Sequence, residues 1–322
     1  MYPSARCLLL LAGAVLVGSG RADDGEKYKY IPADADMVVS ISIRRLVDSD
    51  VFQKYGKPGA VQGFQDPQVR LLLAALGLDP LRDVDSLVLS SSGDVADNPR
   101  VLLAVRGTFD VAKIHAAADL FAKANPAALK IDQTNGLTIY EGVKAGRTVY
   151  ANLDASVMLA STDRDYLIQA VQNPSPGPSP AMKNALAKTP TDGEIAVSVV
   201  VTDAMKKRLS QSTWQGSKLA PKLEMITASV HVTKEVTTTV GICTTDAAAA
   251  ADVKGMLDEH KSWLLGLPVF QPGPLGSLFL DVHHNITIAR DGSSVQVSIR
   301  LTEDMLDKAD KLKNDAKDKP DR

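Results

Sequence analysis

Residues 286–301, ITIARDGSSVQVSIRL, contain the pattern that decides the fold. Apolar side chains occupy every second position from Val295 to Leu301, and polar ones occupy the positions between. Because successive side chains of a β-strand point to opposite faces, this alternation predicts a strand with one buried and one solvated face. Asp291-Gly292 separates it from a second strand predicted over 286–289, which indicates a β-hairpin.

The buried face of such a sheet requires a layer of helices. Residues 114–124 predict one of them, because one helical stripe collects the apolar residues Ile114, Ala117, Ala118, Phe121 and Ala122. We therefore expect an α+β fold in which helices pack on one face of a mainly antiparallel sheet.

The same pattern occurs twice in the chain. A hairpin predicted over 148–162, with its turn at Asp154, precedes a helix over 163–171, as the hairpin of 286–301 precedes a helix over 303–312. Upstream, each half also has a predicted pair of antiparallel strands, at 86–91 with 100–107 and at 225–232 with 236–243.

Two further stretches match between the halves. Pro32–Ser40 and Pro190–Ser198 share Pro, Asp, an acid, Val and Ser at an offset of 158, and Thr108–Ala112 resembles Thr244–Ala248 at an offset of 136. These landmarks predict an internal duplication, with about 22 additional residues within 56–83 of the first copy.

Prolines at every second position in 174–180 separate the copies. They withhold backbone donors and favour an extended, semi-rigid linker, although a ligand for a proline-binding module is an alternative. The predicted organisation is a signal peptide, a first unit, a Pro-rich linker, a second unit and a charged, solvated tail, at 1–22, 23–172, 173–181, 182–313 and 314–322.

The first 22 residues have the plan of a secretory signal, with Arg6, an apolar run from Cys7 to Val17 and small residues up to Ala22. We expect cleavage after Ala22 and a periplasmic or secreted protein. The alternative is an uncleaved anchor, but the run is short for a membrane span.

Cleavage would remove Cys7 and leave Cys243 as the sole cysteine, so no intramolecular disulfide is expected. Cys243 lies in a predicted strand. A buried, unreactive thiol is the simpler interpretation, and a catalytic thiol the alternative.

The composition excludes several classes of partner. The chain has 36 Lys and Arg against 38 Asp and Glu, so it has no overall cationic footprint for nucleic acid or for an anionic membrane surface. Aromatic residues make up only 5% of it, which argues against a stacking platform for sugars or bases. Proteins or apolar molecules remain as expected partners.

The common catalytic motifs are missing from the predicted mature chain, including phosphate-binding Gly-rich loops, Gly-x-Ser-x-Gly, His-Glu-x-x-His and Cys-x-x-Cys. We therefore expect no cofactor and a protein that is not an enzyme.

Only weak metal candidates remain. Asp281 and His283 would share one face of a strand, where His231 of a neighbouring strand could join them. Exposed polar residues on the wet face of the sheet are the alternative.

The repeated acids Asp34 and Asp36, matched by Asp192 and Glu194, indicate a structural turn or cap; a calcium site would need more oxygen ligands.

Residues 69–78, VRLLLAALGL, form the most apolar segment after the signal. They predict a helix that either packs into the core or faces a protein partner or lipid. Asn285-Ile-Thr287 matches the glycosylation pattern, which is weak evidence alone.

Residues 31–36, IPADAD, followed by a Val-rich strand, by 45–49, by 84–88 and by a Gly-Thr-Phe-Asp110 step into an Ala-rich helix, resemble a group of uncharacterised secreted bacterial proteins. The resemblance covers about residues 30–170. It implies a bacterial extracytoplasmic protein with no assigned activity, and 45–49 has no counterpart in the second copy.

The sequence thus predicts a secreted, non-enzymatic binding or scaffolding protein whose sheet faces or 69–78 helix contact a partner. One alternative is a periplasmic carrier of an apolar ligand, which would require a cavity of several hundred Å³. The other is a metal-assisted hydrolase.

Overall fold

The computed structural model describes residues 28–93, 99–144, 146–172, 177–211, 215–264 and 274–317. Contacts divide the chain into two compact units: unit 1 is Met1–Asp48 with Phe52–Lys183, and unit 2 is Ser49–Val51 with Asn184–Arg322. The predicted signal at 1–22, part of the predicted linker (173–176) and the end of the predicted tail (318–322) lie outside the described residues.

The α+β class is confirmed, and every strand pairing given within the units is antiparallel. The described part of unit 1 contains β1 (Met37–Ser42), α3 (Ile43–Asp48), η1 (Phe52–Gly56), α4 (Lys57–Phe64), α5 (Pro67–Leu76), β2 (Val84–Ser92), β3 (Arg100–Gly107), α6 (Val111–Ala124), β4 (Leu129–Thr134), β5 (Leu137–Lys144), β6 (Arg147–Leu153), β7 (Val157–Ser161) and α7 (Arg164–Gln172).

Helix α8 (Pro180–Lys188) contains the boundary between the units. The described part of unit 2 then contains β8 (Ile195–Val200), α9 (Asp203–Gln211), η2 (Gln215–Lys222), β9 (Leu223–Val232), β10 (Val236–Thr244), α10 (Ala247–Leu264), α11 (Pro274–His284), β11 (Ile286–Asp291), β12 (Ser294–Leu301) and α12 (Glu303–Lys317).

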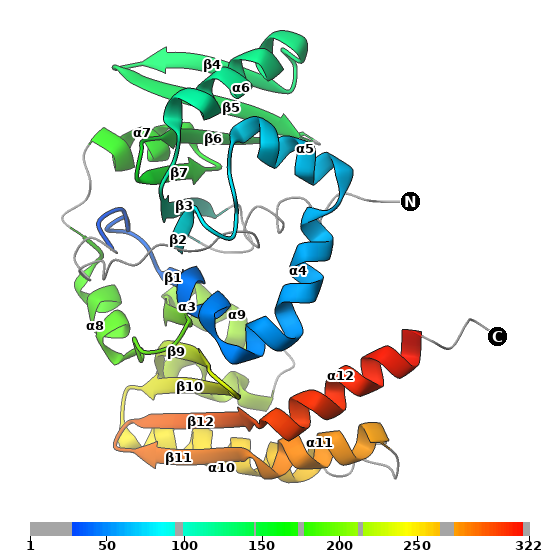
Figure 1. Cartoon of the computed structure of the whole chain (residues 1–322). Coiled ribbons are helices and arrows are strands. Elements are labelled where there is room, and N and C mark those ends of the chain that lie inside the picture. The colour runs from blue at the N-terminus through cyan, green and yellow to red at the C-terminus, as the bar shows by residue number, and fades with distance from the viewer. Residues whose placement is uncertain are drawn as a thin grey trace. The chain divides into compact units, whose positions relative to one another are not determined.

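The strand order is similar in the two units. Unit 1 has the order β1-β2-β3-β7-β6-β5-β4, and unit 2 has β8-β9-β10-β12-β11. The strands β1-β2-β3-β7-β6 of unit 1 are thus arranged along the sheet as β8-β9-β10-β12-β11 are in unit 2. In both units the first three strands are followed by the second strand of a hairpin and then by its first strand. Unit 1 adds the β4–β5 hairpin after α6, whereas unit 2 has α11 after α10 (Figure 1).

The core of unit 1 lies on both faces of its central strands. Leu87 and Val88 are neighbours in β2 and therefore point to opposite faces, yet both are buried. On one face Leu87 packs with Ile43, Val105 and Phe109, joined by Ile114 of α6. Helix α7 packs against β3, β6 and β7.

The core of unit 2 joins α10 to its sheet. Ala250 and Val253 of α10 are buried against Val201, Leu223 and Val295. The alternation predicted for 295–301 is therefore realised at Val295, which is completely buried, while Gln296 is exposed. The helix lies against β11 and β12 in the lower part of Figure 1.

Both predicted hairpins form, as β6–β7 and β11–β12. A third hairpin, β4–β5, was not predicted, although its turn Asn135-Gly136 is a strong signal for one. Both turn residues have positive φ, 53° and 78°, as a two-residue type I′ turn requires.

Gly136→Ala should destabilise this hairpin by about 1 kcal/mol, because an L-residue with a Cβ disfavours the left-handed region. Faster amide hydrogen exchange across 129–144 would show it. Gly142→Ala in β5, where φ is not positive and an added Cβ meets only Val149 O at 3.8 Å, is the matched control. Equal protection in both variants would contradict the prediction.

The structure shows helix at two of the predicted boundaries. Pro180 and Ala181, assigned to the linker, form the first turn of α8; proline suits this position because the first helical N–H has no partner within the helix. Residues 314–317, assigned to the solvated tail, continue α12.

Candidate interaction surface

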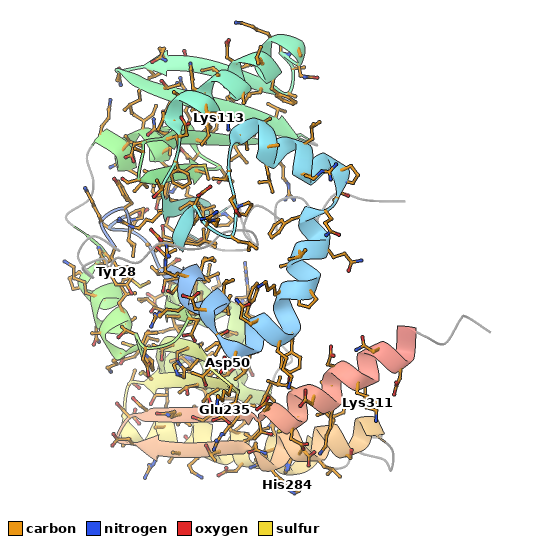
Figure 2. All side chains as sticks on the ribbon, in the orientation of Figure 1. Tyr28, Asp50, Lys113, Glu235, His284 and Lys311 are labelled. Carbon is orange, nitrogen blue, oxygen red and sulfur yellow. The ribbon has the colours of Figure 1, made fainter. Side chains whose placement is uncertain are left out.

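Two neighbouring helices of unit 1, α5 and α6, expose apolar side chains. Helix α5 begins at Pro67, and α6 begins after Asp110, whose Oδ1 accepts a hydrogen bond from Lys113 N at 3.0 Å. The helices contact each other near Gly77, where an added Cβ would meet the Lys113 side chain. Figure 2 labels Lys113 at the start of α6.

Helix α5 turns an apolar face outward. Its exposed side chains have helical spacing and lie on one side: Pro67, Arg70, Leu71, Ala74 and Ala75. Leu71 is 74% exposed, whereas Leu73 and Leu76 are half-buried. The segment predicted at 69–78 is thus a helix that packs with one side and presents leucine and alanine on the other.

Helix α6 does the same, and part of its predicted packing is wrong. Ile114, Ala117, Ala118 and Ala122 are half-buried as a stripe, but Phe121 is 51% exposed. Leu120 is 70% exposed. The exposed apolar positions of this helix are Ala112, Ala116, Leu120, Phe121 and Ala124.

Apart from His115, whose Nδ1 lies 2.9 Å from the Tyr140 hydroxyl, we call the exposed side chains of these helices the α5–α6 surface. It is defined by Pro67, Arg70, Leu71, Ala74 and Ala75 of α5 and Ala112, Lys113, Ala116, Leu120, Phe121, Lys123 and Ala124 of α6. Leu120 was not singled out in the sequence. The signal that identifies it is a helix that is apolar on nearly every side, the same signal that identified 69–78.

The repeated acids have structural partners. Asp34 forms an ion pair with Arg100 and accepts a hydrogen bond from the Tyr166 hydroxyl at 3.2 Å. In unit 2 the buried Glu194 accepts a hydrogen bond from Val232 N at 2.5 Å. These contacts join the residues before the first strand of each unit to residues distant in sequence, rather than forming a local turn or cap.

The pKa of the Tyr166 hydroxyl is strongly perturbed. Burial raises the pKa of its hydroxyl to about 12, and the nearby Asp34 carboxylate reinforces the shift while a hydrogen bond with Ser92 opposes it. Arg100 lies over the ring, 5.1 Å from its centroid. The buried hydroxyl therefore stays protonated at pH values at which an exposed tyrosine would ionise.

The raised pKa predicts alkaline destabilisation. Above about pH 10 the unfolded chain loses the Tyr166 proton while the folded chain keeps it, so this contribution to stability is present below pH 10 and is lost towards pH 12. Between about pH 9 and pH 11 the wild type should lose about 1 kcal/mol more stability than Tyr166→Phe. Urea unfolding at the two pH values measures this, and parallel losses would refute it.

The metal candidates do not converge. Asp281 and His283 were placed on a strand, but they lie on helix α11, where residues two apart point in nearly opposite directions. His283 is buried with Nε2 3.0 Å from Lys261 O, Asp281 accepts a hydrogen bond from Lys308 Nζ at 2.9 Å, and His231 Nδ1 lies 3.6 Å from Glu194 Oε2. No group of three or more potential His, Cys, Asp or Glu ligands occurs in the described part of the chain.

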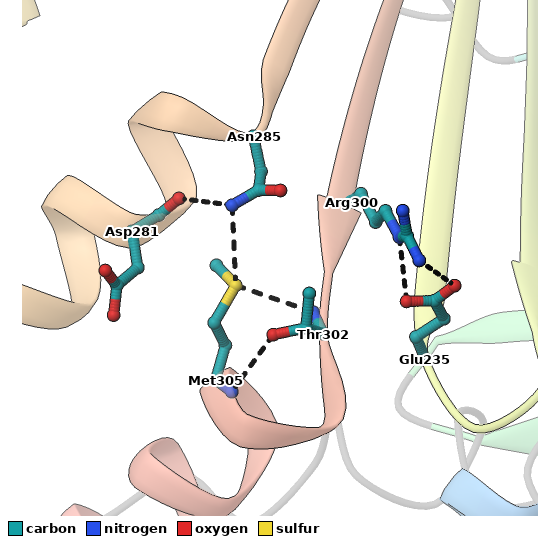
Figure 3. Close-up of polar contacts among 6 residues, drawn as sticks. All are labelled: Glu235, Asp281, Asn285, Arg300, Thr302 and Met305. Carbon is teal, nitrogen blue, oxygen red and sulfur yellow. Dashed lines mark hydrogen bonds and ion pairs between the residues drawn. The ribbon is translucent and has the colours of Figure 1, made fainter.

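The end of α11 is fixed by polar contacts with α12 (Figure 3). Asn285 Nδ2 donates to Asp281 O at 2.8 Å and to Met305 Sδ at 3.9 Å. The amide nitrogen of the Asn285-Ile-Thr287 pattern is thus engaged within the fold. Beside it, Arg300 binds Glu235 through two hydrogen bonds of 2.8 Å, which lower the pKa of that carboxyl.

Cys243 is a buried, free thiol on β10. Ser294 Oγ donates to its sulfur at 3.4 Å, and Lys188 Nζ lies 4.0 Å away. No disulfide occurs among the described residues, and none of the helices described is long and apolar enough to cross a membrane.

Comparison with known proteins finds no matching family and no matching curated protein. Among solved structures the chain is similar to one titled "Structure of crystal form I of TP0453", with 10% sequence identity and a TM-score of 0.45 over 88% of this chain and 96% of that chain.

Proposed function

We propose that this chain is a non-enzymatic binding or scaffolding protein that contacts its partner through the α5–α6 surface. The observation that carries the proposal is the exposure of Leu71, Leu120 and Phe121 on two helices that contact each other. Exposed large apolar side chains that gather on neighbouring elements are typical of interaction sites, whereas scattered ones are ordinary.

The proposed location is outside the cytoplasm. The apolar run from Cys7 to Val17, the small residues up to Ala22 and the resemblance of 30–170 to secreted bacterial proteins support export. We also propose that the two units arose by duplication. The shared strand order supports this, as do the N-caps of α7 and α12, where Asp163 Oδ1 and Thr302 Oγ1 accept hydrogen bonds from the third residue of each helix.

Site-specific photo-crosslinking tests the proposal. A photoreactive phenylalanine analogue replaces Leu71 or Leu120 in the full chain, expressed in its own host, and Lys130, exposed on β4 of the same unit, is the matched control position. We expect one recurrent adduct from both helix positions and none from position 130. Equal labelling at all three positions, or none at either helix position, would contradict the proposal.

A further inference from the structure

We propose that the α5–α6 surface binds a lipid bilayer whose surface carries anionic headgroups. This inference rests on the proposed function and names its partner. Leu71, Leu120 and Phe121 would enter the boundary between headgroups and acyl chains, as the apolar side chains of interfacial helices do.

The exposed face of α5 offers few groups to a protein partner. Pro67, Leu71, Ala74 and Ala75 have no side-chain donor or acceptor, and Arg70 is the one polar side chain among the exposed residues described on this helix. Specific protein interfaces form about one hydrogen bond per 100–200 Å², and the four apolar residues of this face contribute none through their side chains. Acyl chains require none, so the surface fits lipid better.

The charges on the surface favour anionic lipid. The α5–α6 surface contains the bases Arg70, Lys113 and Lys123, and Asp119 is the single acid within the two helices, although the whole chain has a net charge of −2. From the nearly equal numbers of acidic and basic residues in the whole chain we predicted that no anionic membrane surface is a partner. Those totals conceal a local excess of positive charge on these helices.

Two of these bases are available to a ligand. Lys123 pairs with Asp119, but Arg70 and Lys113 form no ion pair with any residue that the structure describes. Asp110, at the start of α6, is occupied in capping that helix, and Asp66 precedes α5. A Lys or Arg close to an anionic membrane surface strengthens binding about fivefold.

Vesicle flotation tests the inference with the full chain. The probes are vesicles of phosphatidylcholine alone and of phosphatidylcholine with about 30% phosphatidylglycerol. We expect preferential binding to the anionic vesicles, weakened by salt because exposed charges are screened. All variants keep the same N-terminal residues, so differences between them report on the helices.

The decisive variant is Leu71→Gln with Leu120→Gln and Phe121→Gln. Each substitution should weaken vesicle binding about tenfold, because it removes one apolar side chain from the acyl boundary. Arg70→Glu with Lys113→Glu should weaken binding to anionic vesicles but not to neutral ones. Matched controls are Phe279→Gln on α11, which is 38% exposed, and Lys130→Glu on β4; both should bind as the wild type does.

The outcomes separate this inference from the proposed function. Wild-type binding by the triple variant, or no binding by the wild type, overturns the inference; if crosslinking at Leu71 and Leu120 then yields a protein adduct, the proposed function stands. A dimer that the triple variant loses in sedimentation analysis, without vesicle binding, assigns the surface to a second copy and also overturns it. Failure of both vesicle binding and crosslinking removes both proposals.

Discussion

Leu167→Ala should lower the free energy of unfolding by about 3 kcal/mol. Leu167 is completely buried in α7, which packs against β3, β6 and β7. Truncation removes the transfer free energy of three buried carbon atoms and leaves a cavity that the rigid sheet beneath cannot close. Urea unfolding followed by circular dichroism measures the loss.

Leu120→Ala is the matched control, because it makes the same chemical change on another helix of the same unit. Leu120 is 70% exposed, so we expect a change within about 0.5 kcal/mol. If the two variants were equally unstable, α7 would not be the packed layer that the contacts indicate. The control also matters for the lipid experiment, since the substitutions on α6 must leave the fold intact.

Gly107→Ala should be about as costly, roughly 3 kcal/mol, for a different reason. Gly107 ends β3 beside the register shift between Val84 and Ser86 of β2. A Cβ there would overlap the carbonyl oxygen of Asp83 and lie 2.7 Å from Val84 Cα, and backbone atoms cannot move aside as a flexible side chain can. The displaced carbonyl would also lose its 2.6 Å hydrogen bond from Thr108 N.

The control substitution for this variant is expected to raise the free energy of unfolding rather than lower it. Gly255 lies within α10, and an added Cβ there meets no atom within 4 Å. Gly255→Ala should therefore stabilise the chain by about 0.5–1 kcal/mol, because alanine favours the helix. If Gly107→Ala also raised the melting temperature, the backbone around the Asp83 carbonyl would have moved away from the added Cβ without loss of stability.

The sequence predicted the strands well wherever one face is buried and the other is wet. Such a strand alternates, as Val295 to Leu301 does, and its register follows from which side chains must be covered. The β4–β5 hairpin also had a local signal in Asn135-Gly136. It was missed because the apolar alternation beside the turn is short, with Leu129 and Ile131 in β4 and Leu137 and Ile139 in β5, although Ile139 is completely buried.

The error at Asp281 and His283 has a different origin. A short apolar run does not distinguish a strand from a buried helix by periodicity, and the strand that begins at Ile286 was extended backwards. Pro274 at the first position of α11 is the local evidence for a helix. The metal hypothesis depended on a two-residue period that this segment does not have.

The candidate surface could be predicted only in part. The apolar character of 69–78 was evident, but a helix that is apolar on several sides does not indicate which side the fold covers. For α6 the predicted stripe included Phe121, and the structure exposes that ring. Which face is covered depends on contacts with elements distant in sequence, and a pattern within one helix contains no information about them.

One place where the two units differ is a natural site for adding new sequence. Between α6 and β6 unit 1 carries the β4–β5 hairpin, whereas between α10 and β11 unit 2 carries a helix, so the shared five-strand path accommodates two unrelated inserts at one position. The turn at Asn135-Gly136 joins the last two strands of the unit 1 sheet, and both of its residues are exposed. A fluorescent reporter spliced into this turn should leave both cores assembled and report on the whole chain inside living cells.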